Sequence, residues 1–179
     1  MLQRELDETR ERSYTDGLTR VSSRMYFEEQ LTLLAAEYDA SDHPEPFCVM
    51  MVDLDQFKSV NDRFGHRIGD EILVLIASML KANIKGRDIV ARYGGDEFAI
   101  LLPQTPLGDA MVLAEDMSKR IAAREIKAKS SGTSYGQMTI SVGAAEYIAN
   151  EGGAKLIDRA DSALYRAKKN GRNRNFAAE

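Results

Sequence analysis

The sequence predicts an α+β fold in which helices pack against one central, mostly antiparallel sheet. Apolar residues recur at helical spacing in four segments, one short run is continuously apolar, and two further runs are joined by a glycine pair as in a β-hairpin. In chain order the segments are helix, strand, two helices, hairpin, helix, strand and helix. This order is similar to a ferredoxin-like palm, which follows strand, helix, two strands, helix, strand.

Composition limits the classes of protein to consider. The 179 residues suit one domain, and the net charge of −4 argues against general nucleic-acid binding through a basic surface. The single cysteine, Cys48, lies in an apolar run, so we expect a core residue and no disulfide framework. No segment approaches the ~18 apolar residues of a membrane span. The charged N-terminus does not resemble a signal peptide, and we expect a cytoplasmic domain without a membrane segment in this chain.

The first half of the chain predicts a helix over residues 23–39 and a loop over 43–46. Residues 47–52 are continuously apolar, which predicts a central strand buried on both faces. This strand ends in Asp53, Leu54 and Asp55. Because a buried strand fixes the residues at its end rigidly, Asp53 is a candidate metal ligand.

The remaining elements follow the same periodicities. The sequence predicts a short helix over 56–64, a turn at 65–66, a helix over 67–83, hairpin strands at 88–91 and 99–102, a helix spanning 110–121, a loop over 129–137, an alternating strand over 138–147 and a helix with its core face over 156–167.

Two adjacent carboxylates, Asp96 and Glu97, stand at the hairpin turn directly after Gly94 and Gly95. A turn does not require carboxylates, and three interpretations remain open. The pair is a solvated acidic turn, part of a Mg²⁺ site, or a metal site with a general base beside it. Asp53 and Asp96 would converge if the buried strand pairs with the hairpin.

A local basic cluster stands near the C-terminus of this acidic chain. It comprises Arg166, Lys168, Lys169, Arg172 and Arg174. Its ordinary explanation is favourable charge at a helix C-terminus, and its functional explanation is binding of phosphates. Lys168 and Arg172 are four residues apart, so we expect them to share one helix face.

Two further side chains have the hydrogen-bonding groups that a guanine base requires. Asn61 offers a donor and an acceptor, and Asp70 offers an acceptor for the N1–H and amino donors of guanine. Each residue alone is more simply a cap or a surface group. The chain contains no G-x-x-x-x-G-K-[ST] sequence, which argues against a P-loop NTPase.

Several motifs together resemble one family, the GGDEF proteins or diguanylate cyclases. Residues 94–98 read GGDEF, and residues 53–62 read DLDQFKSVND, followed by GH at 65–66 and GD at 69–70. The late segments TISVG at 139–143, ADSALYRAK at 160–168 and GRNR at 171–174 also resemble the family pattern. The resemblance covers roughly residues 14–176.

The resemblance implies a palm related to nucleotidyl cyclases and polymerases, which condenses two GTP into cyclic di-GMP and releases two pyrophosphates. It implies a GGDEF catalytic domain over residues 14–179. The preceding residues 1–13 are mixed in charge with a weak heptad, and are either a frayed tail or a remnant of a linker or signalling helix from an upstream sensor or input domain. Since one chain holds one GTP, catalysis should need a homodimer, at least transiently.

The resemblance also assigns roles to individual residues. Asp53 and Asp96 would bind Mg²⁺ or Mn²⁺ with help from the Leu54 carbonyl, and Glu97 would be a metal ligand or assist deprotonation of the attacking 3′-hydroxyl. Asn61 and Asp70 would recognise guanine. The triphosphate would be surrounded by Phe57, Lys58, Lys168 and Arg172.

The chain departs from the family pattern at two places. The product-inhibition motif R-x-x-D is represented by Lys85 and Asp88, and lysine cannot form the bidentate fork of arginine. We therefore expect weak or absent product inhibition there, with Arg87 poorly placed to compensate. Near the N-terminus, Arg20 and Ser23 replace the usual glycine and asparagine, which bears on regulation more than on chemistry.

Two other functions remain to be distinguished from an active cyclase. One is a catalytically silent module that binds GTP or a dinucleotide and acts through protein contacts. The other is a nucleotidyl cyclase with a different product, against which Asp70 argues because it disfavours adenine.

Overall fold

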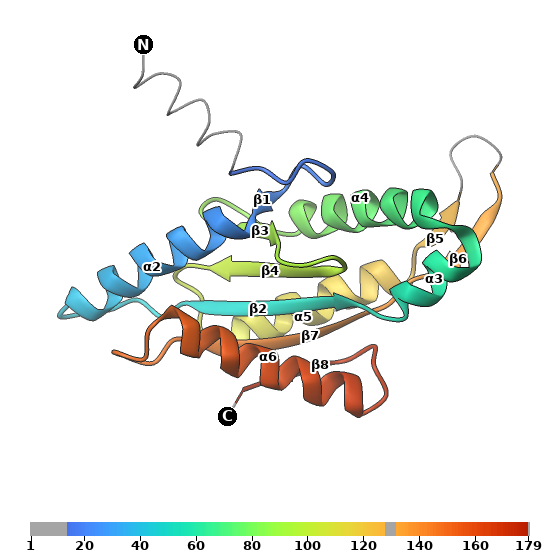
Figure 1. The fold of residues 1–179 in the computed structure, drawn as a ribbon. Helices are drawn as coiled ribbons and strands as arrows, with labels where there is room; N and C mark the ends of the chain where they lie inside the picture. The colour runs from blue at the N-terminus through green and yellow to red at the C-terminus, as the bar shows by residue number, and fades with distance from the viewer. Residues whose placement is uncertain (1–13, 128–131, 179) are drawn as a thin grey trace, which may run out of the picture.

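A six-stranded sheet forms the centre of the computed structural model, which describes residues 14–127 and 132–178 (Figure 1). In spatial order its strands are β1 (Ser22–Ser23), β3 (Ile89–Arg92), β4 (Glu97–Leu102), β2 (Cys48–Leu54), β7 (Ile140–Glu146) and β8 (Asn175–Ala177). The four central strands pair antiparallel, and β1 and β8 add to the two edges in parallel. The predicted α+β palm with a mostly antiparallel sheet is confirmed.

Five helices accompany the sheet in the described part of the chain. They are α2 (Arg24–Ala40), α3 (Phe57–Phe64), α4 (His66–Ala82), α5 (Leu107–Ala122) and α6 (Gly153–Lys169). No described helix has the length and apolar character needed to cross a membrane.

Strand β2 separates two hydrophobic cores because every one of its residues is buried and successive side chains point to opposite faces. Cys48, Met50 and Val52 pack with apolar residues of α4 and α5. Val49 and Met51 pack with residues of α2 and α6. Figure 1 shows α6 along one face of the sheet and α5 along the other. The prediction of a central strand buried on both faces is confirmed.

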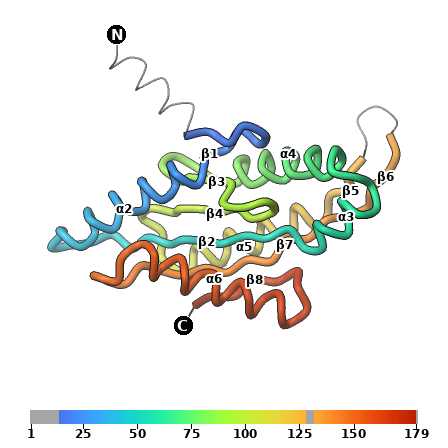
Figure 2. Tube along the Cα trace, in the orientation of Figure 1, coloured from blue at the N-terminus to red at the C-terminus, as the bar shows by residue number. Residues whose placement is uncertain are grey.

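The structure differs from the sequence predictions mainly in short or polar elements. Ser134–Gln137, expected in a loop, form β6, which pairs with β5 (Glu125–Lys127) in a small second sheet. Strand β7 is buried at six consecutive positions instead of alternating. After α6 the chain turns back so that β8 runs beside β7 (Figure 2). Strands β5, β6 and β8 have only three or four residues each, so they lack the long apolar signal on which the predictions relied.

The N-terminal departures have local structural explanations. Ser23 is the N-cap of α2, and its hydroxyl accepts a hydrogen bond from the Tyr26 N–H at 3.3 Å. Serine therefore replaces asparagine with an equally good capping group. Arg20 has a φ of 62°, the left-handed conformation in which glycine is unstrained. Residues 1–13, interpreted as a frayed tail or as the remnant of a linker or signalling helix, lie outside the described residues.

Candidate active site

Pairing of β2 with β4 brings the two acidic segments together. Asp53 lies directly opposite Glu97 in the strand register, and the Leu54 N–H donates to the Asp96 carbonyl at 3.2 Å. Like charges directly opposite each other on adjacent strands are destabilising. A nearby cation would relieve this repulsion.

Lys168 supplies a positive charge beside this pair. Its Nζ lies 2.7 Å from Oδ2 of Asp53, and the Asp53 residue is only 8% exposed. The pKa of Asp53 is raised to about 6, chiefly by burial and also by the charges of Asp96 and Glu97, which together outweigh the lowering by Lys168. The net increase shows that one lysine does not fully compensate burial and the neighbouring carboxylates.

The composition of the site suits a divalent cation that takes some of its ligands from the protein and the others from a substrate. Across residues 14–127 and 132–178, no group of three or more His, Cys, Asp or Glu side chains is arranged to hold a metal by itself. Mg²⁺ commonly uses only one or two protein carboxylates and takes further oxygens from phosphates and water. A buried, electrostatically strained Asp53 beside Asp96 and Glu97 fits such a partial ligand set.

The glycine turn is held by an arginine that sequence reasoning missed. Arg92 donates to the Gly95 carbonyl through Nη2 at 2.9 Å and Nε at 3.2 Å, and its Nη1 lies 3.5 Å from Asp16. Neither Gly94 nor Gly95 has a positive φ. At Gly94 a Cβ would lie 2.8 Å from Glu97 Oε2, so the absence of a side chain leaves room for that carboxylate. Two features of the sequence could have indicated this contact, the position of Arg92 just before the glycine turn and the acidic Asp16 in the N-terminal segment.

Glu97 is the first residue of β4, whereas the sequence placed it in the turn. The difference matters because a strand residue has a fixed register. Glu97 is therefore held opposite Asp53 by the ladder and does not depend on the conformation of the turn.

Asn61 and Asp70 lie on the adjacent helices α3 and α4. Among the described residues, Oδ1 of Asn61 is buried without a hydrogen-bond partner. A Cβ at Gly69 would lie 1.9 Å from this oxygen, so only glycine permits the observed placement of Asn61. Buried polar atoms normally have partners, and an orphaned acceptor beside exposed Asp70 is consistent with a ligand site.

The two residues expected near a triphosphate at the start of α3 differ in exposure. Phe57 is 8% exposed and packs in the core, whereas Lys58 is exposed. No side chain caps this helix, whose N-cap Gln56 is left-handed. N–H groups at a helix N-terminus are suited to binding phosphate. Phe57 would therefore contact a triphosphate through its backbone N–H, because its ring is buried in the core.

The expected shared helix face of Lys168 and Arg172 is wrong. Helix α6 ends at Lys169, and Gly171 has a φ of 106°. The Arg172 N–H donates to the Ala167 carbonyl at 3.1 Å and the Gly171 N–H to the Lys168 carbonyl at 3.4 Å. This is a Schellman ending, which places Arg172 in the following loop.

Comparison with known proteins identifies the family. Residues 13–174 match the family model described as "Diguanylate cyclase, GGDEF domain". The chain belongs to the GGDEF family. This GGDEF domain is 41% identical over 134 residues to diguanylate cyclase DgcM of Escherichia coli K12, covering 75% of the chain and 31% of DgcM. It is 37% identical over 174 residues to the response regulator PleD of Caulobacter vibrioides, covering 96% of the chain and 37% of PleD.

A solved structure shares nearly the whole fold. The coiled coil and GGDEF domain of DgcB from Caulobacter crescentus, in complex with c-di-GMP, superposes with a TM-score of 0.92 and 33% identity. The alignment covers 99% of this chain and 92% of that structure. The GGDEF domain therefore spans about a third of the curated relatives above but nearly all of this structural neighbour.

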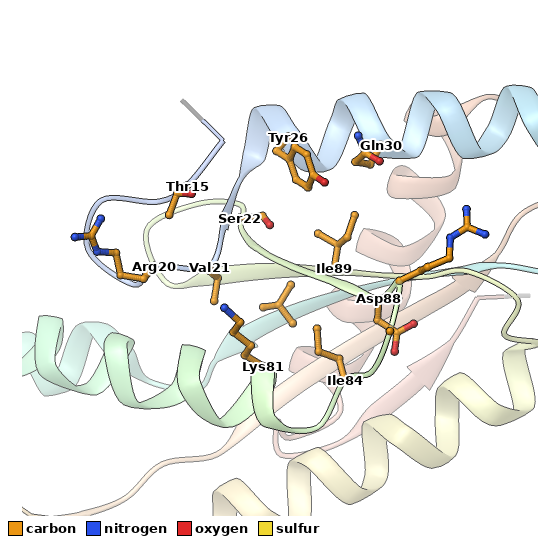
Figure 3. A pocket seen from close by; sticks show the side chains of 13 residues that line it. Thr15, Arg20, Val21, Ser22, Tyr26, Gln30, Lys81, Ile84, Asp88 and Ile89 are labelled. Carbon is orange, nitrogen blue, oxygen red and sulfur yellow. The ribbon is translucent and has the colours of Figure 1, made fainter. Parts of the chain in front are cut away.

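A cavity of about 480 Å³ lies away from the paired carboxylates, between β1, α2 and the turn before β3 (Figure 3). Asp88 lines it, and Figure 3 shows this carboxylate directed away from Tyr26 and Gln30 on α2. Asp88 Oδ2 accepts the Lys85 N–H at 3.0 Å. Asp88, the acid of the degenerate product-inhibition motif, thus caps the turn formed by residues 85–88. None of the predicted substrate or metal residues lines this cavity.

The raised pKa of Asp53 predicts a pH dependence in the metal-free GGDEF domain. Its pKa of about 6 lies above the ordinary 3.8, so the folded state binds the proton more tightly, and Asp53 costs stability as pH rises through this window. Protons should compete with Mn²⁺ below about pH 6. We expect Mn²⁺ affinity to fall roughly tenfold per pH unit there and to level off above it.

Carboxyl-carbon NMR titration of Asp53, with Mn²⁺ binding measured across the same pH range, tests this. Because Lys168 lowers the pKa, Lys168→Met should move both midpoints upward. An Asp53 pKa near 4 in the native protein would contradict the account of the site.

Proposed function

We propose that this GGDEF domain is a diguanylate cyclase that condenses two GTP into cyclic di-GMP and two pyrophosphates. The observation that carries the proposal is the in-register pairing of Asp53 with Glu97, with Lys168 bound to Asp53. In each half-reaction a ribose 3′-oxygen bonds to the α-phosphorus of the other GTP. The bond from that phosphorus to the β-phosphate bridging oxygen breaks, and the 3′-hydroxyl proton leaves to a base.

Residues of this chain would divide the work as follows. Asp53, Asp96 and the Leu54 carbonyl would hold Mg²⁺ or Mn²⁺, which when bound would polarise the reacting phosphate and lower the pKa of the attacking hydroxyl. Glu97 would complete the ligand set or accept the proton. The ammonium of Lys168, which pairs with Asp53 in the absence of substrate, would turn to the substrate phosphates. Arg172, Lys58 and the N–H groups at the start of α3 would bind the remaining phosphate oxygens.

Guanine would be read by Asn61 and Asp70. The orphaned Asn61 oxygen is an acceptor for a guanine N–H, and the Asp70 carboxylate accepts from N1–H and the amino group. Adenine has an acceptor at N1, which a carboxylate repels. Guanine selectivity is therefore expected from this pair.

Each domain would bind one GTP, so two copies must face each other to bring each 3′-oxygen to the opposite α-phosphate. We propose a homodimer, at least transient, formed under the control of an upstream input domain. The curated relatives are longer than the matched part, which is about a third of each, so they have room for such a domain.

Product analysis tests the reaction. Incubation with GTP and Mg²⁺ should yield cyclic di-GMP and two pyrophosphates per product, as resolved by mass, and ATP should yield none. GTP bound by a dimer but returned unchanged would favour the silent binding module. A cyclic product from ATP would favour a cyclase of different specificity.

Gly69→Ala should raise the KM for GTP at least roughly tenfold, because a Cβ 1.9 Å from Asn61 Oδ1 must displace the guanine-reading amide. Gly108→Ala is the matched control, since a Cβ there meets nothing within 4 Å. Steady-state kinetics with GTP measure the effect. An unchanged KM in folded Gly69→Ala would remove Asn61 from the proposed guanine site.

Product inhibition through the Lys85–Asp88 turn should be weak. Lysine offers one ammonium where the family pattern has a planar fork, and Asp88 is already bonded to the Lys85 N–H. Lys85→Arg should strengthen inhibition by added cyclic di-GMP in an initial-rate assay. Strong inhibition of the native chain that disappears in Asp88→Ala would overturn this expectation.

A further inference from the structure

Asp55 is a buried carboxylate two residues beyond Asp53, and the proposed chemistry does not use it. It is 5% exposed and accepts three hydrogen bonds. The Thr139 hydroxyl donates to Oδ2 at 2.6 Å, the Ser141 hydroxyl to Oδ1 at 2.7 Å and the Asn173 backbone N–H to Oδ2 at 2.9 Å. In the described part of the chain no lysine or arginine side chain pairs with it.

The three donors come from two different segments. Ser141 lies in β7 and Thr139 directly precedes this strand, which already pairs with β2 in the sheet. Asn173 belongs to the loop after α6, which no sheet pairing joins to the end of β2. The third bond therefore ties this loop to the end of β2, next to a bond in which the Val142 N–H of β7 donates to the Arg174 carbonyl at 3.1 Å.

That loop has a conformation that needs support. Arg172 and Asn173 have φ values of 59° and 47°, and two successive non-glycine residues rarely occupy the left-handed region. The Asn173 N–H lies directly after Arg172 and is bonded to Asp55. A fixed Asn173 therefore limits where the Arg172 backbone, and with it the guanidinium, can lie.

We infer that Asp55 is a positioning residue that holds the Arg172 loop against the substrate phosphates. The inference rests on the proposed function, because that function places the triphosphate beside Arg172. A long guanidinium binds phosphate strongly only when its backbone is already ordered, since otherwise binding must order the loop. Loss of the Asp55–Asn173 bond should weaken GTP binding without removing any group that touches GTP.

Asp55→Ala should weaken GTP binding about tenfold, by analogy with residues that orient direct ligands elsewhere. Ser141→Ala and Thr139→Val are matched controls, because each removes a bond to the same carboxylate but keeps the Asn173 bond. Both controls should bind GTP within about twofold of the native chain. Asp55→Asn should recover binding, because its amide oxygen can accept the Asn173 N–H while its amino group donates to the Ser141 hydroxyl.

A double-mutant cycle with Arg172→Ala separates positioning from general destabilisation. If Asp55 acts through Arg172, Asp55→Ala should cost little further affinity in the Arg172→Ala background. Additive losses, or equal losses in the Ser141→Ala and Thr139→Val controls, would overturn the inference.

Amide hydrogen exchange tests the link without substrate. The Asn173 N–H of the native protein should be protected, and Asp55→Ala should remove that protection while Ser141→Ala should not. Rapid exchange at Asn173 in the native protein would overturn the inference. Absence of GTP binding by the native chain would instead refute the proposed function, and the exchange result would still decide whether Asp55 orders the loop.

Discussion

Asp53→Asn is expected to lower cyclic di-GMP formation by at least roughly 100-fold while leaving the thermal stability no lower than that of the native chain. Asparagine keeps the shape of the side chain but lacks the charge that would bind a divalent ion. Its introduction also removes a carboxylate whose pKa is raised first by burial and then by repulsion from Asp96 and Glu97. Loss of activity with unchanged or raised stability would show that the Asp53 carboxylate serves function and not folding.

Initial rates of product formation and the melting temperature measure the two effects together. Asp42→Asn is a suitable control, because it makes the same chemical change at an exposed position in the loop after α2. Near-native activity in Asp53→Asn would contradict the proposed metal site. A large fall in melting temperature would show that the carboxylate is needed for folding.

Gly143→Ala is expected to destabilise the fold by about 3 kcal/mol or more. A Cβ at this position in β7 would lie 2.2 Å from the Ala160 carbonyl oxygen and from the Leu164 nitrogen. Both atoms belong to the backbone of α6, which cannot move aside as a flexible side chain can. The helix would have to shift away from the sheet, and Lys168 on α6 would lose its contact with Asp53.

Urea unfolding measures the loss, and Gly153→Ala provides a graded comparison. A Cβ at Gly153 would meet only the Leu31 side chain at 3.0 Å, so a small rotamer adjustment should suffice. Its expected cost is below about 1 kcal/mol. Equal stability of Gly143→Ala and the native chain would mean that α6 does not pack on β7 as closely as described.

Some parts of the site could be predicted because their sequence signals are strong and local. The apolar run before Asp53 predicts a buried strand, and the Gly94–Gly95 pair predicts a hairpin. Convergence of Asp53 with Asp96 and Glu97 then needs only one strand pairing. Both segments belong to the central sheet, where apolar pattern and burial agree.

Other parts depend on contacts that no local pattern contains. Four-residue spacing predicts one helix face for Lys168 and Arg172, but Gly171 ends the helix between them. Pairing of Lys168 with Asp53 depends on how closely α6 approaches β7, which Gly143 sets. These relations come from tertiary packing, which overrides periodicity at the ends of elements.

The most direct test of a cyclase built from two facing domains is the dependence of cyclic di-GMP production on protein concentration, measured with saturating GTP and Mg²⁺. We expect the rate to rise more steeply than linearly at low concentration, to become linear once dimers dominate, and to be lost in Glu97→Ala. Absence of product at high concentration, even with a dimerising helix fused to the N-terminus, would contradict the proposed activity. A strictly linear rate from a protein that remains monomeric would contradict the facing-dimer mechanism.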